Sequence, residues 1–380
     1  MSRVIAMVGT RPEAIKMAPV IKALRAARWC KCLVVATSQH RHLLDPIFDL
    51  FEISVDVDLD VMQEGQSLSS LSSRLFERID AVYDAHKPEL VLAQGDTTTV
   101  LVSAMAAFYR RIPFAHVEAG LRTGDLNNPF PEEFNRIVAA RVASFHFAPT
   151  ETARSALLAE DVSDEAIFVT GNTVIDALYE IASRKLHAPI QFHSGHRVIL
   201  MTAHRRENFG APMERIFRAV RRLTDLYPDV EIVYPVHPNP AVREPAFKML
   251  SGIPRLHLIA PVSYEALIAL LKRCTLVLTD SGGIQEEAPA LAKPVLVMRE
   301  ETERPEGVAC GVAKLVGTDE AAIVKEVGRL LDDEDAYNAM ARASSPYGDG
   351  QAADRIVAII GQKFGTRLLD ITSSYEPAGL

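Results

Sequence analysis

The sequence predicts an α/β protein made of two doubly wound, Rossmann-like halves. Short apolar runs of strand length alternate with longer stretches of helical spacing, and the alternation restarts near residue 198 after a weakly patterned stretch. With 380 residues, 48% of them hydrophobic, the chain is longer than one core usually supports, which favours two domains. We expect these to be residues 1–170 and 171–350. A C-terminal helix at about 351–364 should pack back on the first, and residues 365–380 should form a loose tail.

Composition argues against several classes of partner and location. The formal net charge of −8 and the isoelectric point near 5.8 argue against nucleic acid, because binding a phosphate backbone requires a basic face. The four cysteines lack the spacing of a zinc site, and the N-terminus is typical of a strand rather than of a signal peptide. No apolar run approaches the roughly 20 residues that cross a bilayer. We therefore expect a cytoplasmic protein that does not span a membrane.

The first strand–turn–helix unit contains a candidate phosphate ligand. A strand over Val4–Val8 leads into Gly9–Glu13 and then into apolar residues at helical spacing. Pro12 suits the first position of that helix. Because open α/β sheets bind ligands at the carboxyl ends of their strands, Arg11 is placed to form a forked contact with phosphate. Lys16 lies further along the helix and could equally be a solvated surface charge.

Polar side chains follow several other strands of the first half. These strands are expected at Leu33–Thr37, Leu90–Ala93, Pro113–Val117, Ser144–Ala148 and Ile167–Thr170. The loop after the first of them, Ser38–His42, is a candidate contact because it is polar and contains histidines. Asp96 follows the second and could either bind a ligand or cap the next helix.

A longer loop follows the strand that ends at Val117. It is rich in Gly, Pro and Asn, and it carries Glu118 and Glu132 before a helix that begins near Pro131. Loop carboxylates taken singly are usually just solvated. Here, however, several loops that would share one sheet edge each carry an acid, and catalytic residues concentrate on such loops. We therefore expect a group of acids at the carboxyl edge of the first sheet.

The second half repeats the strand–turn–helix pattern. Its strands are expected at Val198–Met201, Glu231–Tyr234, Leu256–Ile259, Thr275–Leu278 and Pro294–Met298. The loop after the first of these carries His204 with Arg205 and Arg206, which makes it a candidate phosphate contact. The loop after the last strand contains Arg304 among several glutamates, so it is another charged strand end.

The stretch Asp280–Pro289 predicts an anion seat at the start of a helix. Gly282 and Gly283 would let a ligand approach the backbone, where N–H groups and the positive end of the helix dipole favour phosphate. A glutamate in the first helical turn could then accept hydrogen bonds from a ribose diol, which would make the seat specific for a nucleotide. The alternative is a plain capped helix with Asp280 or Ser281 as its N-cap, and a short Gly pair does not decide between the two.

Eight runs of residues, taken together, resemble the non-hydrolysing UDP-N-acetylglucosamine 2-epimerases in that family's order and over nearly the whole chain. They are Gly9–Pro19, Gly95–Thr98, His116–Gly124, Pro131–Glu133, Gly171–Asp176, His204–Glu207, Asp280–Glu287 and Thr302–Glu306. The resemblance implies a GT-B fold, a homodimer, and reversible interconversion of UDP-GlcNAc and UDP-ManNAc without a metal or a nicotinamide cofactor. It also implies that the product supplies ManNAc for cell-surface polysaccharide.

The resemblance further implies roles for individual residues. UDP would leave C1, a 2-acetamidoglucal intermediate would form, and UDP would be added back after C2 is reprotonated on its other face. Glu118 and Asp96 are expected to transfer the protons, with Glu132 tuning or sharing that role and His204 beside the phosphates. The positions that match UDP- and sugar-binding residues are Arg11, Lys16, Arg136, Asn172, His204, Ser281, Gly282, Gly283, Glu287 and Arg304.

Some members of this family also bind a second UDP-GlcNAc that activates the enzyme. The residues at the matching positions are Gln39, His40, Gln66, Arg205 and His237. His42 and Gly65 depart from the family pattern, since a longer polar or basic residue can stand at those positions. Allosteric activation is therefore a hypothesis, and hyperbolic initial rates with UDP-ManNAc that traces of UDP-GlcNAc leave unchanged would count against it.

Three other functions compete with this interpretation. A GT-B glycosyltransferase would share the fold and the ribose contact, but it needs an acceptor, and a group of acids fits elimination better. A hydrolysing epimerase would release free ManNAc and UDP. A catalytically inactive nucleotide-sugar sensor would keep the phosphate contacts, but it would not need Asp96, Glu118 and Glu132.

Overall fold

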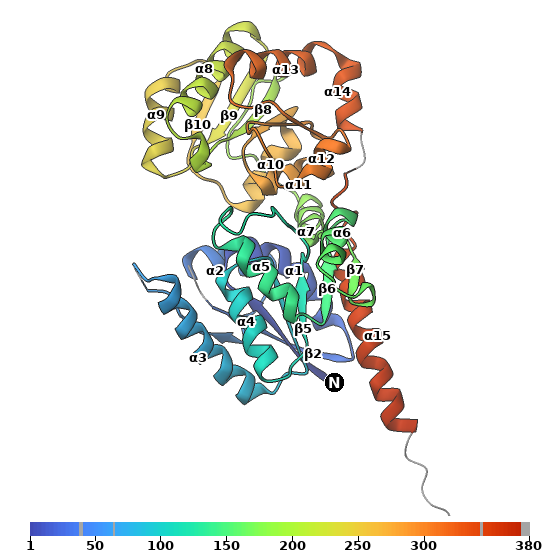
Figure 1. The fold of residues 1–380 in the computed structure, drawn as a ribbon. Coiled ribbons are helices and arrows are strands. Elements are labelled where there is room, and N and C mark those ends of the chain that lie inside the picture. The colour runs from blue at the N-terminus through green and yellow to red at the C-terminus, as the bar shows by residue number, and fades with distance from the viewer. Residues whose placement is uncertain (38–40, 64, 343–344, 374–380) are drawn as a thin grey trace, which may run out of the picture. The chain divides into compact units, whose positions relative to one another are not determined.

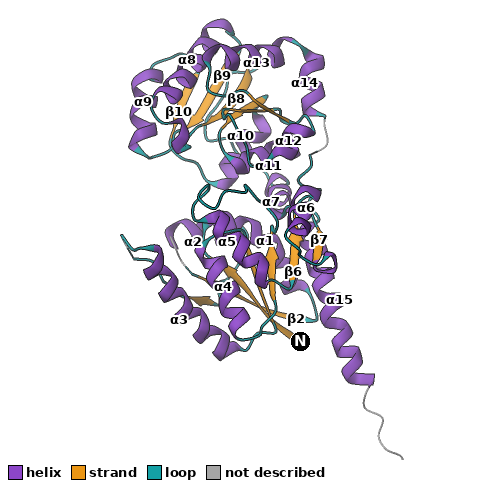
Figure 2. Cartoon of the chain, in the orientation of Figure 1, coloured by secondary structure: helices purple, strands orange, loops and turns teal. Residues whose placement is uncertain are grey.

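The structure is a computed structural model that describes residues 1–37, 41–63, 65–342 and 345–373. Contacts between residues divide the chain into two compact units, one of Met1–Ala177 with Gly348–Leu380 and one of Leu178–Tyr347. Each unit is a parallel β-sheet with helices packed on it (Figure 1, Figure 2). The predicted α/β class is confirmed in both units.

The sheet of the first unit has the strand order β3-β2-β1-β4-β5-β6-β7, and every neighbouring pair is parallel. Its strands are β1 (Ser2–Val8), β2 (Cys30–Ala36), β3 (Val57–Asp58), β4 (Leu90–Gln94), β5 (Phe114–Val117), β6 (Phe145–Ala148) and β7 (Ile167–Val169). The helices along this part of the chain are α1 (Arg11–Ala26), α2 (Arg41–Leu50), α3 (Leu68–His86), α4 (Thr98–Tyr109), α5 (Glu132–Val142), α6 (Glu151–Ala159), the 3-10 turn η1 (Asp164–Ala166) and α7 (Thr173–Ala182).

The central strands of this sheet are continuous apolar runs. Their side chains are buried on both faces of the sheet, because helices cover both faces. All five residues of β4 are buried, as are all residues of β1 except Arg3. The apolar side of α3 is also buried, with Leu71, Leu75 and Ile79 in one core cluster with residues of β1 and β4.

The sheet of the second unit has the order β10-β9-β8-β11-β12-β13, again with parallel neighbours. Its strands are β8 (Arg197–Thr202), β9 (Val230–Pro235), β10 (Leu256–Ile259), β11 (Leu276–Thr279), β12 (Val295–Val297) and β13 (Ala313–Leu315). Its helices are η2 (Arg206–Asn208), α8 (Ala211–Leu226), α9 (Pro240–Leu250), α10 (Tyr264–Arg273), α11 (Gly282–Ala290), α12 (Pro305–Ala309), α13 (Glu320–Asp332) and α14 (Glu334–Ala341).

The last helix, α15 (Ala352–Ser373), returns to the first unit. Its first turn is tied down by Asp176, whose Oδ1 accepts the backbone N–H of Ala353 at 2.8 Å. Further along, Phe364 stacks on Trp29 with ring centroids 6.4 Å apart. The sequence pattern predicts a loose tail from residue 365, but the helix continues to Ser373. No proline interrupts it before Pro377.

The other differences from the expected organisation are small. The division between the units falls inside α7, between Ala177 and Leu178, shortly after the expected boundary at residues 170 and 171. The strands β3 and β13 were not predicted because each includes a charged residue, Asp58 or Lys314, and so neither forms an apolar run. None of the helices among the described residues is both long and apolar enough to cross a membrane.

Candidate functional site

The candidate site residues follow the carboxyl ends of the central strands. In the first sheet β1 has β2 on one side and β4 on the other, and in the second sheet β8 lies between β9 and β11. Strand order reverses at these places, and open α/β sheets bind ligands at such switch points. The loops that begin there contain Asp96 after β4, His204 after β8 and Asp280 after β11, and the short loop after β1 leads directly to Arg11, the first residue of α1.

In the first unit, three side chains from other elements hold Glu118. Both of its carboxylate oxygens accept hydrogen bonds from Lys16 Nζ of α1 at 2.7 Å. Gln94 at the end of β4 donates through Nε2 to Oε2, and Asn172 Nδ2 lies 3.5 Å from Oε1. Only 4% of the Glu118 side chain is exposed, so these donors replace the water that would otherwise solvate its charge.

The backbone at Glu118 is also unusual. Its φ of +63° lies in the left-handed region, which residues other than glycine rarely occupy. Glu118 follows β5 directly, so the strained residue turns the chain where the strand ends. Strain of this kind persists only where the surrounding fold fixes it, and it clusters at functional sites. The expected role of Lys16 as a site residue, rather than a solvated charge, fits this geometry.

Asp96 is a second acid in the same unit, and 29% of its side chain is exposed. Arg136 Nη2 of α5 lies 2.8 Å from Asp96 Oδ2. The pKa of Asp96 is raised, chiefly because burial penalises its charge. The charges of Glu118 and Glu132 act in the same direction, while Arg136 and Lys16 oppose them. The three acids that the resemblance associates with proton transfer are therefore close enough to influence one another, and Arg136 and Lys16 lie among them.

The adjacent glutamates Glu132 and Glu133 begin α5 but have different surroundings. Glu133 is fully buried and accepts the backbone N–H groups of Thr123 at 3.0 Å and of Gly124 at 3.1 Å. It therefore fastens the long loop onto α5. Glu132 is only partly buried, and its charge acts on Asp96, so Glu132 fits the expected group of acids and Glu133 is structural.

A buried glutamate that the motif analysis did not single out connects two loops. Glu13 accepts the backbone N–H of Thr10 at 3.0 Å and the hydroxyl of Thr97 at 2.5 Å, and it also accepts the N–H of Gly9. Burial raises its pKa to about 7, although these three hydrogen bonds act against the rise. The sequence signal was the spacing Thr10-x-x-Glu13, which is a helix capping box. Glu13 thus ties the loop after β1 to the loop after β4.

In the second unit, Asp280 joins the loops after β8 and β11. It is fully buried, and its Oδ2 accepts the backbone N–H groups of His204 and Arg205, both at 2.8 Å, and Asn208 Nδ2 at 3.1 Å. Asp280 is therefore not the N-cap of α11. Ser281 occupies that position, and among the described residues it makes no side-chain capping bond. These contacts favour the anion-seat interpretation over a plain capped helix.

His204 lies beside this seat. Its Nε2 is 3.9 Å from Asp280 Oδ1, and its ring stacks on that of His237 with centroids 5.5 Å apart. Burial lowers the pKa of His204, Asp280 raises it, and the nearby Arg205 and His237 lower it further. A neutral imidazole with one N–H suits a hydrogen bond to a phosphate oxygen.

The two glycines of the seat have different surroundings, and the atom nearest to Gly282 is the end of a flexible side chain. A Cβ on Gly282 would lie 2.9 Å from Glu303 Oε1, whereas a Cβ on Gly283 would meet nothing within 4 Å. Arg205 Nη2 lies 3.1 Å from the same glutamate oxygen. Burial opposes ionisation of Glu303, but Arg304, Arg299 and Arg205 outweigh it and hold its pKa at about 2.

The two glutamates of α11 lie beyond its first turn, which contains no acidic residue, so the expected position in the first turn is wrong. The two have different partners. Tyr264 donates its hydroxyl to Glu287 Oε1 at 2.8 Å, whereas Glu286 accepts a hydrogen bond from Arg304 Nε. Both glutamates are buried. Glu286 thus positions Arg304. Glu287 is then the better candidate for binding the ribose, which agrees with the position that the resemblance assigns to it.

The remaining predicted residues are less informative. Arg11 is the first residue of α1 and is partly exposed. Gln66 bonds locally, to Met62 Sδ at 2.7 Å and to Arg74. Gln39 and His40 lie outside the described residues, so the structure does not test the hypothesis of an activating site.

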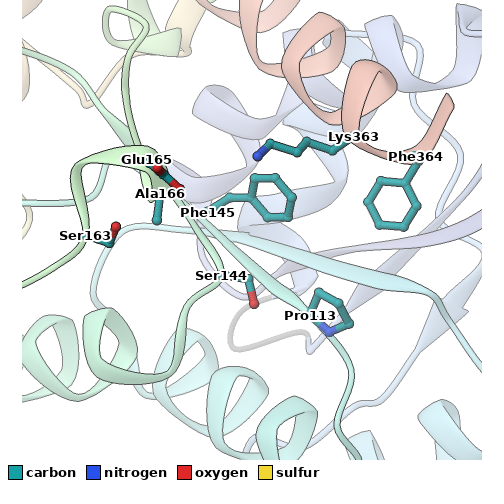
Figure 3. A pocket seen from close by; sticks show the side chains of 8 residues that line it. All are labelled: Pro113, Ser144, Phe145, Ser163, Glu165, Ala166, Lys363 and Phe364. Atoms are coloured by element: carbon teal, nitrogen blue, oxygen red, sulfur yellow. The ribbon is translucent and has the colours of Figure 1, made fainter. Parts of the chain in front are cut away.

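A hollow of about 450 Å³ in the first unit is not part of the candidate site. It is lined by Pro113, Ser144, Phe145, Ser163, Glu165, Ala166, Lys363 and Phe364 (Figure 3). Pro113 and Ser144 directly precede β5 and β6, so the hollow opens at the amino ends of these strands. The acids described above follow the carboxyl ends.

Two parallel α/β sheets with polar loops at both switch points define a GT-B-type nucleotide-binding protein. Comparison with known proteins narrows this class. The family model described as UDP-N-acetylglucosamine 2-epimerase matches residues 22–361. The chain belongs to this family and is an enzyme, which confirms the resemblance seen in the sequence.

Individual relatives agree with the family model. The chain is 50% identical over 365 residues to the UDP-N-acetylglucosamine 2-epimerase of Escherichia coli K12, covering 93% of this chain and 97% of the relative. It is 48% identical over 366 residues to that of Bacillus subtilis 168, covering 96% of each. Among solved structures, that of UDP-GlcNAc 2-epimerase from Neisseria meningitidis bound to UDP-GlcNAc has a TM-score of 0.87 at 42% identity, covering 95% of this chain and all of the other.

Proposed function

We propose that the protein interconverts UDP-GlcNAc and UDP-ManNAc at C2 by eliminating and re-adding UDP, without net hydrolysis. Family membership supports the substrate, since the meningococcal relative is bound to UDP-GlcNAc and an S. aureus relative at 46% identity is a co-structure with UDP. The observation that carries the mechanism is the pair of acids in the first unit. Lys16, Gln94 and Asn172 stabilise a negative charge on Glu118, whereas burial raises the pKa of Asp96.

These two environments suit the two halves of a proton exchange. We assign Glu118 as the base that takes the proton from C2, while the C2–H electrons form the C1–C2 double bond and UDP leaves with the C1–O electrons. Asp96, the acid with the raised pKa, returns a proton to the other face of C2, and a phosphate oxygen of UDP then adds to C1. In the reverse direction the two residues exchange roles.

The departing UDP is assigned to the second unit. The amides at the start of α11, with Arg304 and His204, would take up the charge that develops on the leaving phosphate. Glu287 would accept hydrogen bonds from the ribose hydroxyls. Neither role requires a metal or a nicotinamide.

Proton NMR of UDP-GlcNAc incubated with the enzyme in D2O tests the reaction. The proposal requires deuterium at C2 while UDP-ManNAc accumulates. Release of free ManNAc would identify a hydrolysing epimerase instead. Consumption of the sugar nucleotide with C2 unexchanged would contradict elimination and re-addition altogether.

The biological setting is also proposed from the family. We expect a cytoplasmic homodimer whose product supplies ManNAc for cell-surface polysaccharide. Light scattering coupled to size exclusion measures the dimer directly. Activation by a second UDP-GlcNAc would appear as a lag or a sigmoidal rate with UDP-ManNAc alone, relieved by traces of UDP-GlcNAc.

A further inference from the structure

The second unit contains a group of histidines around a buried carboxylate, away from the candidate site. Glu231 is the second residue of β9 and is fully buried. It lies near the amino end of its strand, whereas the loops with His204 and Asp280 follow carboxyl ends. Nothing in the proposed reaction uses Glu231, so its burial calls for a separate explanation.

Two of these histidines come from one tight turn before β8. The backbone N–H of His196 donates to the carbonyl of His193 at 3.3 Å, and Gly195 between them has a φ of +81°. This turn places the two rings side by side, with centroids 5.0 Å apart. The backbone N–H of His193 also donates to Glu231 Oε1 at 2.7 Å, which fixes the turn against the strand.

Both rings direct Nδ1 toward the same carboxylate oxygen. His193 Nδ1 lies 3.1 Å and His196 Nδ1 3.3 Å from Glu231 Oε1, and the three atoms lie within 4.8 Å of one another. Ligand atoms on a tetrahedral zinc with bonds of roughly 2.0–2.1 Å are about 3.4 Å apart, so the two N–O distances are those of such a site. His196 Nδ1 is buried and, among the described residues, has no hydrogen-bond partner.

A third histidine orients the carboxylate. His257 of β10, the strand next to β9 (Figure 1), lies with Nε2 2.7 Å from Glu231 Oε2. This contact leaves Oε1 directed at the turn. Carboxylates that bind metals are themselves hydrogen-bonded by a second layer of side chains, which is the position that His257 occupies.

We propose that His193, His196 and Glu231 bind a Zn²⁺ ion. Imidazole nitrogens with one carboxylate oxygen are a donor set that zinc accepts. Among the described residues, the cluster includes no thiolate and no cage of oxygens that would favour a softer or harder ion. The His193 side chain is 70% exposed, so the ion can enter from solvent, and water can complete its coordination. The ion would fasten residues 193–196 to the amino edge of the second sheet. It would take no part in the proposed reaction.

Zinc titration of the full-length, tag-free protein tests this site. After removal of metal with a chelator, the protein should take up one Zn²⁺ per chain in competition with a chromophoric chelator. Co²⁺ in place of Zn²⁺ should give the visible absorption of a tetrahedral or five-coordinate site. The double variant H193A/H196A should lose both signals. H187A removes an exposed histidine of the preceding segment and should keep them.

The variant His257→Gln distinguishes the role of the three proposed ligands from that of His257, which orients the carboxylate. It should weaken zinc binding by about tenfold or more without abolishing it, because the three ligands remain. The exchange of the C2 hydrogen in D2O should stay normal in every variant and in the metal-free protein. The zinc measurements do not depend on this reaction, so they test the metal site even if the proposed function is wrong. Absence of stoichiometric zinc, or equal binding by wild type and H193A/H196A, would overturn the proposal and identify a purely hydrogen-bonded cluster.

Discussion

The two units use carboxylates in opposite ways. In the first, cations and amides from several elements surround Glu118 and Asp96, so the acids themselves are the groups that are held in place. In the second, Asp280 is buried beneath the loops and receives the backbone N–H groups of His204 and Arg205. In the second unit the carboxylate of Asp280 therefore holds the loops in place, and the backbone amides and cationic side chains of these loops are the groups that it positions. The first arrangement suits proton transfer, and the second suits an anion.

The strongest way to break this comparison is to remove charge from the first unit alone. Glu118→Gln should lower kcat by about 100-fold to 10,000-fold, because an amide cannot take the C2 proton. Its affinity for UDP should stay near that of wild type, since Glu118 is not among the proposed UDP contacts, which apart from Arg11 belong to the second unit. Steady-state kinetics with UDP-GlcNAc and calorimetry with UDP measure the two quantities separately.

Glu151→Gln is a matched control, because Glu151 is exposed on α6 and has no proposed role. It should leave both quantities unchanged. If Glu118→Gln kept near-normal turnover, the assignment of Glu118 as a base would be wrong. If Glu118→Gln abolished UDP binding as well, the assignment of proton transfer to the first unit and of UDP binding to the second would be wrong.

The matching change in the second unit is Asp280→Asn. All three hydrogen bonds go to Oδ2, and the amide oxygen of Asn can accept them only without the negative charge that strengthens them, so the variant should lose about 1–3 kcal/mol of stability in that unit. UDP affinity should fall by roughly tenfold, equivalent to about 1.4 kcal/mol, because the connection between the two loops is weakened. Hydrogen exchange resolved by unit and UDP calorimetry measure these effects.

Asp225→Asn, an exposed change on α8, should alter neither property and serves as the control. Full stability with weakened UDP binding in the Asp280 variant would place Asp280 in contact with ligand rather than beneath the loops. Unchanged UDP binding would contradict the anion seat.

Much of this arrangement follows from local sequence patterns, and the exceptions have physical causes. The strands and their polar loops are predictable because apolar runs and turn residues act over short distances. The motif around Asp280 indicated a helix start correctly, but sequence left the role of Asp280 open as a possible N-cap. Its partners lie 75 and 76 residues away, and only the parallel pairing of β8 with β11 brings them together.

Neighbouring glutamates show the same limit. Glu286 and Glu287 are equivalent in sequence, and only the contacts with Arg304 and Tyr264 separate a positioning role from a candidate ribose ligand. The sequence did not indicate a site at Glu231 either, because this residue belongs to a segment whose pattern predicts only an apolar strand. Its importance depends on histidines from two other segments.

The smallest expected effect concerns Glu13, which links the two loops of the first unit. Its pKa is raised to about 7 in the native state from an ordinary value of 4.5, chiefly by burial. Above pH 7 both states are ionised, so the native state bears the full cost of the buried charge. As pH falls from 7 toward 4.5 only the native state binds the proton, and the free energy of unfolding should rise, by up to about 2 kcal/mol.

Glu13→Gln should remove this dependence while keeping the loops joined, because its oxygen can accept the N–H of Thr10 and its amide can donate to the Thr97 hydroxyl. The chain has a single tryptophan, Trp29, which lies in the first unit, so its fluorescence follows unfolding of that unit in urea. Measured at pH 5, 6, 7 and 8, the difference in unfolding free energy between wild type and variant should favour wild type more at pH 5 than at pH 7. Titrations of other groups cancel in this difference. A constant difference across that range would mean that Glu13 is ionised throughout, and that its three donors outweigh burial.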